Sequence, residues 1–380
     1  MPWKEQSKVD QRREFARLAT GVDANMSQLC QRFEISRKTG YKWLARYRRL
    51  GDAGLEEQSR RPQQTPGRTQ PNMERAVLAV RDKHRKWSGR KIRRRLQDLG
   101  KIAVPAASTI GEILRRHGRL DEAAGSQHRP WQRFTHPHPN DLWQMDFKGH
   151  FGLGDGGRCH PLTVLDDHSR YVVGLRACAN EQGQTVRAEL IMIFRRYGLP
   201  LAMLMDNGSP WGAQDRGCYT QFSVWLMRLA IRVMHGRPYH PQTQGKDERF
   251  HRTLNEELLQ LMVLRNYDRA QRSFDHFRFS YNHERPHEAL QLAVPATRYA
   301  SSGRDYPEQL AAIEYPDSLA VRKVCAGGWI YYGGRQYRIS KAFVGYPIGL
   351  RQTNVDGVLD VYFCRYRVAQ INQRNPSVDG

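Results

Sequence analysis

The chain has 380 residues, with 61 Lys and Arg against 38 Asp and Glu, a formal net charge of +23 and a hydrophobic content of 39%. Its length predicts several domains, and its 10% aromatic content excludes a disordered chain, because such chains lack core-forming residues. No apolar run reaches the roughly 18 residues of a membrane span, no apolar leader opens the chain, and the six Cys occur without a CxxC pair, which favours a reducing cytosol.

The positive charge is concentrated near the N-terminus. Residues 1–135 hold 31 Lys and Arg and 14 Asp and Glu, a net charge of +17, whereas residues 136–380 hold 30 and 24, a net charge of +6. Such asymmetry indicates a polyanionic partner, and a nucleic acid is the obvious one because cationic side chains displace the counterions of its phosphates. The alternative is a basic protein without such a partner.

Residues 1–57 predict a helix-turn-helix. Ser27 is placed to cap a short helix, and Ser36 to cap a second, basic helix after a break. The first residues of such a second helix enter the major groove of DNA. The predicted DNA-binding side chains of this unit are Arg37, Lys38, Lys42 and Arg46. Any small helical hairpin would be the alternative.

A second helix-turn-helix is predicted for residues 73–120, in tandem with the first, between proline-containing linkers at 58–72 and 121–140. Apolar periodicity begins at residue 73, and Ser88 and Ser108 are placed to open two further helices. The predicted DNA-binding side chains here are Arg90, Lys91 and Arg94.

Residues 141–300 predict a mixed α/β domain in which helices cover a sheet. The expected strands are 142–148, 161–165, 171–177, 201–205 and 231–235, and the expected helices are 182–197, 222–230, 246–265 and 268–290. The pattern then changes to short strands separated by Gly-Gly and Asp-Gly turns, which predicts a small β-barrel over 315–372. The expected strands of that barrel are 329–332, 335–339, 347–352 and 358–364.

Three acidic residues lie within or at the ends of predicted strands and helices of the α/β domain. Asp146 lies inside the first strand, where a carboxylate is costly unless it is paired or bound to a metal. Asp206 follows the strand 201–205, and Glu248 lies in the first turn of a helix. Strand ends of open α/β sheets are common ligand sites, so the three side chains are able to converge.

Converging carboxylates require a cation. A ligand set of oxygens alone suits Mg²⁺ or Mn²⁺, and a pair of such ions supports the breaking and joining of phosphodiester bonds. Any one of these acids alone would be read as a turn or capping residue. The three together in so basic a chain favour a site with two divalent ions.

Several segments resemble the integrase core of bacterial insertion-sequence transposases, which belong with the retroviral integrases and have an RNase H-like core. The resemblance covers about 140–300 strongly, the helical units moderately and the last sixty residues loosely. The segments that carry it are Trp-Gln-Met-Asp-Phe-Lys-Gly at 143–149, Leu-Asp-Asp-His-Ser-Arg at 165–170, Asp-Asn-Gly at 206–208, Arg-Pro-Tyr-His-Pro-Gln-Thr-Gln-Gly-Lys at 237–246, Glu-Arg-Phe-His-Arg-Thr-Leu at 248–254 and Tyr-Asn-His-Glu-Arg-Pro-His at 281–287.

The resemblance implies a catalytic site of the DDE type, in which Asp146, Asp206 and Glu248 are the catalytic and metal-binding acids. The interval between the second and third acids is longer than is usual in the family, and residues 210–218 supply the surplus. Asp247 is the alternative third acid. Glu248 is preferred because it directly precedes the matching Arg-Phe-His-Arg-Thr-Leu segment.

Cationic neighbours of the third acid are predicted to hold DNA phosphates beside the metal ions. These residues are Arg237, His240, Lys246, Arg249 and Arg252. For Arg249 and Arg252 a solvated helix face is an equal alternative. Asp166 and Asp167 are interpreted as turn acids.

The leading hypothesis is therefore a bacterial transposase, cytoplasmic and associated with the nucleoid. It would bind the terminal inverted repeats of its element, cut DNA with Mg²⁺ or Mn²⁺, join the end to target DNA and act as a homo-oligomer. The alternative is a DNA-binding regulator derived from an inactive transposase. A third hypothesis, a plain RNase H-type nuclease, does not explain the two helical units and the β-rich tail.

Overall fold

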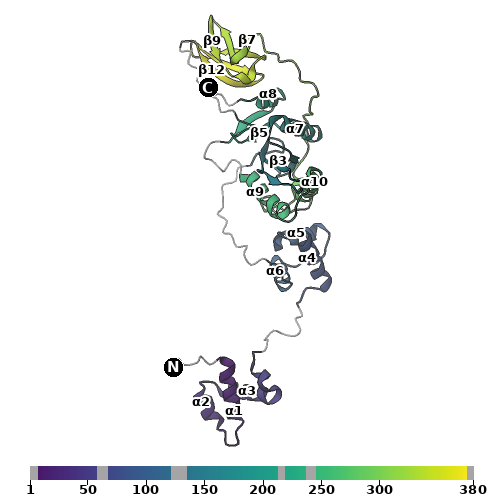
Figure 1. Ribbon diagram of the computed structural model, residues 1–380, viewed down its shortest axis with the longest axis vertical. Coiled ribbons are helices and arrows are strands. Elements are labelled where there is room, and N and C mark those ends of the chain that lie inside the picture. Colours follow the sequence, from purple (N-terminus) through teal and green to yellow (C-terminus); the bar gives the residue numbers. More distant parts are fainter. Residues whose placement is uncertain (1–6, 58–66, 121–134, 213–218, 237–244, 375–380) are drawn as a thin grey trace. The chain divides into compact units, whose positions relative to one another are not determined.

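The computed structural model describes residues 7–57, 67–120, 135–212, 219–236 and 245–374 (Figure 1). The chain divides into two compact units, Met1–Arg68 and Thr69–Gly380. Within the described ranges, no helix combines the length and the apolar character needed to cross a membrane.

The first unit is a bundle of three helices rather than a hairpin of two. Ser36 caps the third helix as expected, since its hydroxyl accepts the Thr39 N–H, but Asn25 rather than Ser27 caps the second. Gly40 allows the helices to approach closely, because a Cβ there would lie 2.6 Å from the Cys30 Sγ. The helices are α1 (Lys8–Ala19), α2 (Met26–Arg32) and α3 (Arg37–Leu50).

The second unit begins with another group of three helices, referred to below as the second helical module. Ser88 precedes its middle helix as predicted, whereas the last helix begins one residue before Ser108 and has Ala106 at its N-cap. Trp87 and Ile92 are buried at the centre of the module. Its helices are α4 (Pro71–Lys83), α5 (Gly89–Asp98) and α6 (Ala107–Arg116).

A six-stranded sheet forms the centre of the α/β domain, which confirms the predicted mixed core. β3 pairs antiparallel with both β1 and β4, whereas β1, β5 and β6 run parallel to one another, and β2 pairs with the start of β3. The strands are β1 (Leu142–Phe147), β2 (Phe151–Gly152), β3 (Arg158–Asp166), β4 (Val172–Cys178), β5 (Ala202–Met205) and β6 (Arg232–His235).

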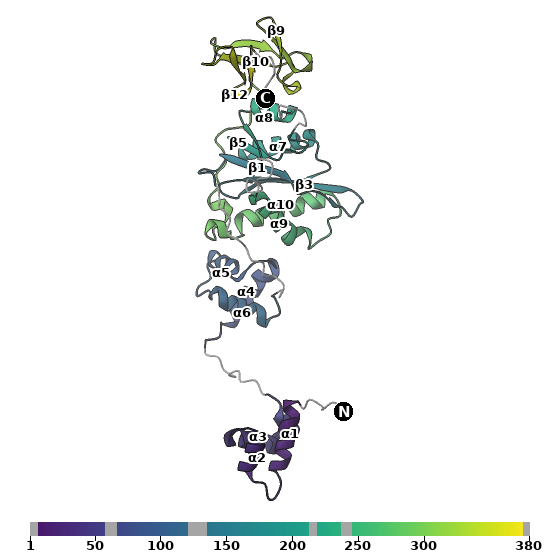
Figure 2. The same ribbon diagram turned by 90° about the vertical axis from the view of Figure 1, so that its left-hand side faces the viewer.

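Helices cover both faces of this sheet (Figure 2). α7 and α8 pack on one face around Phe194 and Trp225, and α9 and α10 pack on the other around Phe250 and Phe274. The helix expected to run unbroken to residue 265 instead passes into a turn of π-helix at Asn255–Leu259. The four helices are α7 (Gly183–Tyr197), α8 (Gln221–Arg228), α9 (Gly245–Leu254) and α10 (Tyr267–His283).

The C-terminal strands form two separate sheets, so the predicted closed barrel is not confirmed. A four-stranded antiparallel sheet has the order β12-β11-β10-β7, and β8 and β9 form a hairpin. The sequence analysis located four of these strands and missed the first and last. The strands are β7 (Ala320–Lys323), β8 (Trp329–Tyr332), β9 (Arg335–Arg338), β10 (Pro347–Gln352), β11 (Val358–Phe363) and β12 (Tyr366–Asn372).

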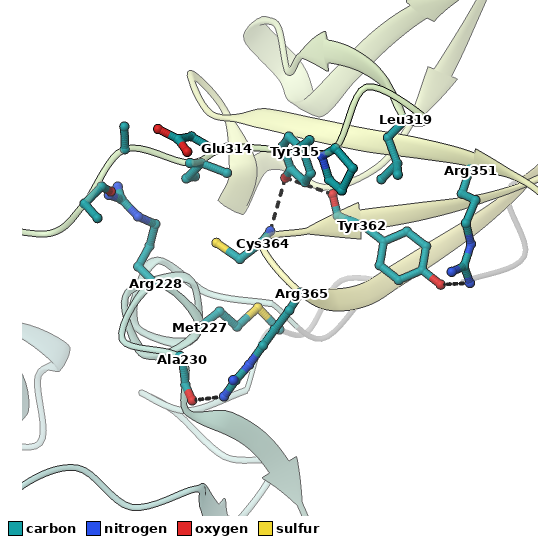
Figure 3. Close-up of a pocket in the computed structure, with 14 residues that line it drawn as sticks. Met227, Arg228, Ala230, Glu314, Tyr315, Leu319, Arg351, Tyr362, Cys364 and Arg365 are labelled. Atoms are coloured by element: carbon teal, nitrogen blue, oxygen red, sulfur yellow. Dashed lines mark hydrogen bonds between the residues drawn. The ribbon is translucent and has the colours of Figure 1, made fainter. Parts of the chain in front are cut away.

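α8 joins the C-terminal sheets to the α/β domain. Its Val224 and Met227 are buried in the same apolar cluster as Phe343 of the C-terminal part. Figure 3 shows a surface pocket of about 540 Å³ at this junction, where Arg365 donates a hydrogen bond to the carbonyl of Ala230. Because apolar side chains from both parts share one core, the C-terminal sheets are an integral part of this unit rather than a tethered tail.

Candidate active site

Sheet register places the first two acids side by side. β1 runs parallel to β5, and Gln144 lies opposite Leu204. Asp146 and Asp206 each follow two residues later on their own strands, at the carboxyl ends of two neighbouring parallel strands. This is the edge at which open α/β sheets present ligand-binding side chains.

The turn after β5 holds Asp206 in place. The Asp206 carboxylate accepts the Gly208 N–H at 3.0 Å, and its main-chain carbonyl lies 2.8 Å from the His235 Nδ1. The Asn207 side chain donates to the carbonyl of Gly236 at 2.8 Å. The Asp-Asn-Gly segment is therefore a hydrogen-bonded turn that connects the end of β5 to the end of β6.

The first turn of α9 carries two acids on different sides. Glu248 is exposed, whereas Asp247 is 1% exposed and faces the sheet. Burial raises the pKa of Asp247 well above its ordinary value, and the charge of Asp146 adds to the effect. Glu248 is thus the acid of this pair that a solvent-borne ion or DNA phosphate is able to reach.

A buried polar cluster connects the strand of Asp146 to the helix of Glu248. The Thr163 hydroxyl donates to the Asp146 carbonyl at 2.9 Å and lies 2.9 Å from the His251 Nε2. The same oxygen lies 3.3 Å from an Asp247 carboxylate oxygen. Burial lowers the pKa of His251 to about 3, so this imidazole is neutral and available as a hydrogen-bonding partner. We call Thr163, Asp247 and His251 the α9 clasp.

Asp146 lies at the centre of the acidic group. Burial raises its pKa to about 6, while the Phe147 N–H, at 2.8 Å from its carboxylate, opposes the shift. The charges of Asp206, Glu181 and Glu248 raise the pKa further. Glu181 was not identified from the sequence, because nothing in its local pattern distinguishes it from a surface acid next to His160.

The donor set suits a hard divalent cation. The charges of three further carboxylates act on Asp146, and none of the charges that shift its pKa is positive. Oxygen ligands of this kind match Mg²⁺ and Mn²⁺. A second grouping is possible beneath them, since single ligand atoms of Asp146, Asp247 and His251 lie within 4.8 Å of one another.

The predicted phosphate ligands near Glu248 differ in their surroundings. Lys246 is half-buried and pairs with the buried carboxylate of Asp167, so it is not the exposed cation that the sequence analysis expected. Burial lowers its pKa to about 8. Arg249 and Arg252 are exposed and form no ion pair among the described residues. Arg237 and His240 lie outside the described residues.

Most of the predicted DNA-binding side chains of the first helical unit are exposed. Arg37, Lys38 and Lys42 are exposed on the first half of α3. Arg46 differs, because its half-buried guanidinium lies over the Trp43 ring at 5.1 Å. Arg46 therefore contributes to the packing of the helix as well as to its charge.

The α5 residues that were predicted to bind DNA differ in their surroundings. Lys91 is only 8% exposed, the Arg90 guanidinium lies 3.9 Å from a Glu288 carboxylate oxygen, and Arg94 bonds to Asp98. Sequence periodicity shows which residues share a helix face, but it does not show what that face contacts.

Family models match most segments of the chain. Residues 136–241 and 229–295 match models of the integrase core domain, and 319–379 match the C-terminal domain of IS481 family transposases. Residues 11–63 match a helix-turn-helix domain, and 39–114 match a homeodomain-like domain.

Curated relatives are similar over part of the chain. The IS407 insertion-element protein of 31.7 kDa from Burkholderia multivorans is 24% identical over 176 residues, which are 46% of this chain and 61% of that protein. The Gag-Pol polyprotein of Koala retrovirus is 28% identical over 146 residues, which are 38% of this chain. The chain spans only 8% of the length of that polyprotein.

Solved structures give weaker likenesses. A chain of a simian T-cell lymphotropic virus intasome, in complex with the PP2A regulatory subunit B56 gamma, is 16% identical with a TM-score of 0.37, over 70% of this chain and 91% of that chain. The catalytic core of HTLV-2 integrase in complex with magnesium is 16% identical with a TM-score of 0.33, over 43% of this chain and 99% of that chain.

The sheet topology, the acids at its edge and the two core-domain matches define an integrase-core protein. The match to the C-terminal domain of IS481 family transposases and the helix-turn-helix matches add to this, although each match covers less than half of the chain. Together these findings support an insertion-sequence transposase of the retroviral integrase superfamily.

Proposed function

We propose that this protein binds the ends of its own mobile element, cuts the DNA there and joins the freed 3′-hydroxyl to target DNA. Asp146, Asp206 and Glu248 serve as the acids of the reaction, with two Mg²⁺ or Mn²⁺ ions as cofactors. The observation that supports this proposal best is the placement of Asp146 and Asp206 at the carboxyl ends of two neighbouring parallel strands, with the charges of Asp206 and Glu248 both acting on Asp146.

Each acid has a distinct task in the proposed site. Asp146, half-buried near the end of β1, is the rigid ligand, because its main chain pairs with Thr163 of the neighbouring strand β3. Asp206 is held by its turn, and Glu248 reaches the site from α9. Divalent ions held there would neutralise the phosphate and lower the pKa of an attacking hydroxyl.

Glu248 is proposed as the third acid in preference to Asp247. Asp247 is fully enclosed and its carboxylate already has a hydroxyl partner, so it is suited to holding the helix in place. The exposed carboxylate of Glu248, on the same turn, is able to bind a metal ion that also contacts DNA. Glu181 is the further acid whose charge acts on this site.

DNA binding is assigned to the helical units and to the arginines beside Glu248. Arg37, Lys38 and Lys42 would contact DNA through the start of α3, and Arg249 and Arg252 would contact phosphates near the acids. A homo-oligomer follows from the proposed reaction, because two element ends must be brought together.

The proposal is tested with the DNA that flanks the gene, as a labelled end substrate, and the full-length protein. The wild type should nick and join this DNA only with Mg²⁺ or Mn²⁺. Asp146→Asn should lose at least about a thousandfold of this activity, because removal of a metal-held charge raises the barrier by several kcal/mol. End binding should stay within about twofold. Full joining activity in Asp146→Asn would refute the proposal.

The same experiment distinguishes the proposed transposase from the alternative function. A DNA-binding regulator derived from an inactive transposase would bind the end DNA yet produce no metal-dependent nick. We do not favour it, because all four acidic side chains of the site are intact in the sequence.

A further inference from the structure

An ion-paired surface lies between the second helical module and the α/β domain. Glu284, which follows α10, accepts from the Lys83 Nζ at 2.9 Å and from the Arg95 Nη2 at 2.7 Å. Its carboxylate is only 15% exposed. Although burial opposes the shift, these cations hold the pKa of Glu284 below its ordinary value.

A second acid continues this surface. Glu257 lies in the π-helical turn that follows α9, and it accepts from the Trp87 Nε1 at 3.3 Å. Arg285 donates to the same carboxylate from its Nε at 3.0 Å and its Nη2 at 2.9 Å. Both nitrogens donate to one carboxylate oxygen, and the Trp87 N–H donates to the other, so hydrogen bonds to a charged group hold both oxygens of Glu257. Glu257 is therefore held between the module and the α/β domain.

The middle helix of the module has its basic side turned to these acids. Lys91 is buried, and burial lowers its pKa to about 8 with a further contribution from the charge of Arg285, while Glu257 and Glu288 attract it. Ionised side chains are seldom enclosed unless they face a partner of opposite charge. A helix that read DNA with this side would leave Lys91 and Arg95 open to solvent.

We infer that the basic side of α5 is a protein-docking surface, which fixes the second helical module to the turn after α9, and that α6 is the helix of this module that faces DNA. The inference rests on the proposed binding of element ends. Ser108 at the start of α6 is exposed, as are Glu112 and Arg115 one and two turns later. Docking thus joins the DNA-reading module to the helix that carries Glu248.

Lysine reactivity in the full-length protein tests the docking. An amine-acylating reagent with detection by mass spectrometry should modify Lys91 at least about tenfold more slowly than the exposed Lys101 of the same module. Glu257→Gln combined with Glu284→Gln should raise the rate at Lys91 at least about fivefold and leave Lys101 unchanged. Glu112→Gln, which removes an exposed acid of the module, should change neither rate. Equal reactivity of Lys91 and Lys101 in the wild type would overturn the docking.

DNA binding tests the assignment of α6 separately. Ser108→Glu should weaken binding to the flanking DNA at least about tenfold, because it places a charge against the phosphates, whereas Arg90→Ala should change it less than about threefold. The reverse ranking would overturn the inference. If the wild type binds no end DNA at all, the proposed function fails, while the lysine result still decides the docking.

Discussion

Single residues show where sequence reasoning succeeds and where it stops. Asp146 and Asp206 are identifiable from the sequence because the first lies inside a clear strand pattern and the second directly follows one, and parallel pairing then places them together. The α9 clasp was not foreseen. Thr163 and His251 are 88 positions apart, and no local pattern shows that a Thr in one strand will meet a His one helical turn beyond the third acid.

The clasp carries a prediction at this scale. Thr163→Val should destabilise the protein by roughly 1–3 kcal/mol, because it leaves the buried His251 and the Asp146 carbonyl without their hydroxyl partner. It should also lower the proposed metal-dependent cleavage at limiting Mg²⁺, since the link between β3 and α9 is broken. Thr163→Ser should restore both. Chemical denaturation and cleavage assays measure the effects, and unchanged stability in the Val variant would contradict the network.

Unlike the substitution of Thr163, a neutral replacement of Asp247 should hardly change the stability. Burial raises the pKa of Asp247 well above the ordinary value, because it disfavours the charged form. Asp247→Asn should therefore change the free energy of unfolding by less than about 1 kcal/mol, because a neutral amide of the same shape keeps a hydrogen-bonding group beside the Thr163 oxygen. A loss of several kcal/mol in denaturant titrations would show that the charged form matters.

Among the elements, most strands and helices were predictable because their apolar periodicity is strong. The errors share a physical cause. Edge strands such as β7 and β12 have mixed patterns, and tertiary packing decides whether they pair. The predicted barrel is not confirmed for a related reason, since strand patterns predict pairing but not whether a sheet closes on itself.

Close packing of β4 against α7 permits a test of the core. A Cβ on Gly174 would lie 2.4 Å from the Ile193 Cδ1 and 3.2 Å from the Val164 Cγ2. Gly174→Ala should cost about 1–3 kcal/mol of stability through overpacking. Gly152→Ala is the control, because a Cβ there meets nothing within 4 Å. Equal melting temperatures for the two variants would contradict the packing described.

The docked α5 predicts a pH dependence. The pKa of Lys91 is lowered to about 8 from 10.5, so the penalty for burying its charge is complete below pH 8 and declines as pH rises. Unfolding should therefore cost about 1 kcal/mol more at pH 9 than at pH 8 from this group. Lys91→Met should lack this increment. Thermal unfolding of the wild type and of Lys91→Met at pH 8 and pH 9 measures this difference. The same change in stability with pH in both proteins would contradict the burial of Lys91.

At the scale of the whole molecule, charge asymmetry predicted the polyanionic partner but not the surfaces that meet it. Arg90, Lys91 and Arg94 of α5 were predicted to contact DNA, whereas Lys91 is buried and Arg95 of the same helix pairs with Glu284. Long-range ion pairs of this kind join residues almost two hundred positions apart, which no local pattern encodes.

The first helical unit supplies a whole-molecule prediction. Arg37→Ala combined with Lys38→Ala should weaken binding to end DNA and reduce the slope of log affinity against log salt concentration by about two, because each phosphate contact contributes close to one. Melting temperature should hardly change, since both side chains are exposed. An unaltered salt slope would remove α3 from the DNA-binding surface.

Binding of Mn²⁺ to the protein without DNA, followed by electron paramagnetic resonance, tests the central claim most directly. We predict that Asp206→Asn and Glu248→Gln each weaken Mn²⁺ binding at least about tenfold, and that Asp247→Asn leaves it within about twofold. The contrary result would be undiminished binding in Glu248→Gln together with its loss in Asp247→Asn. That outcome would move the ion to Asp146, Asp247 and His251 and would contradict the proposed trio of acids.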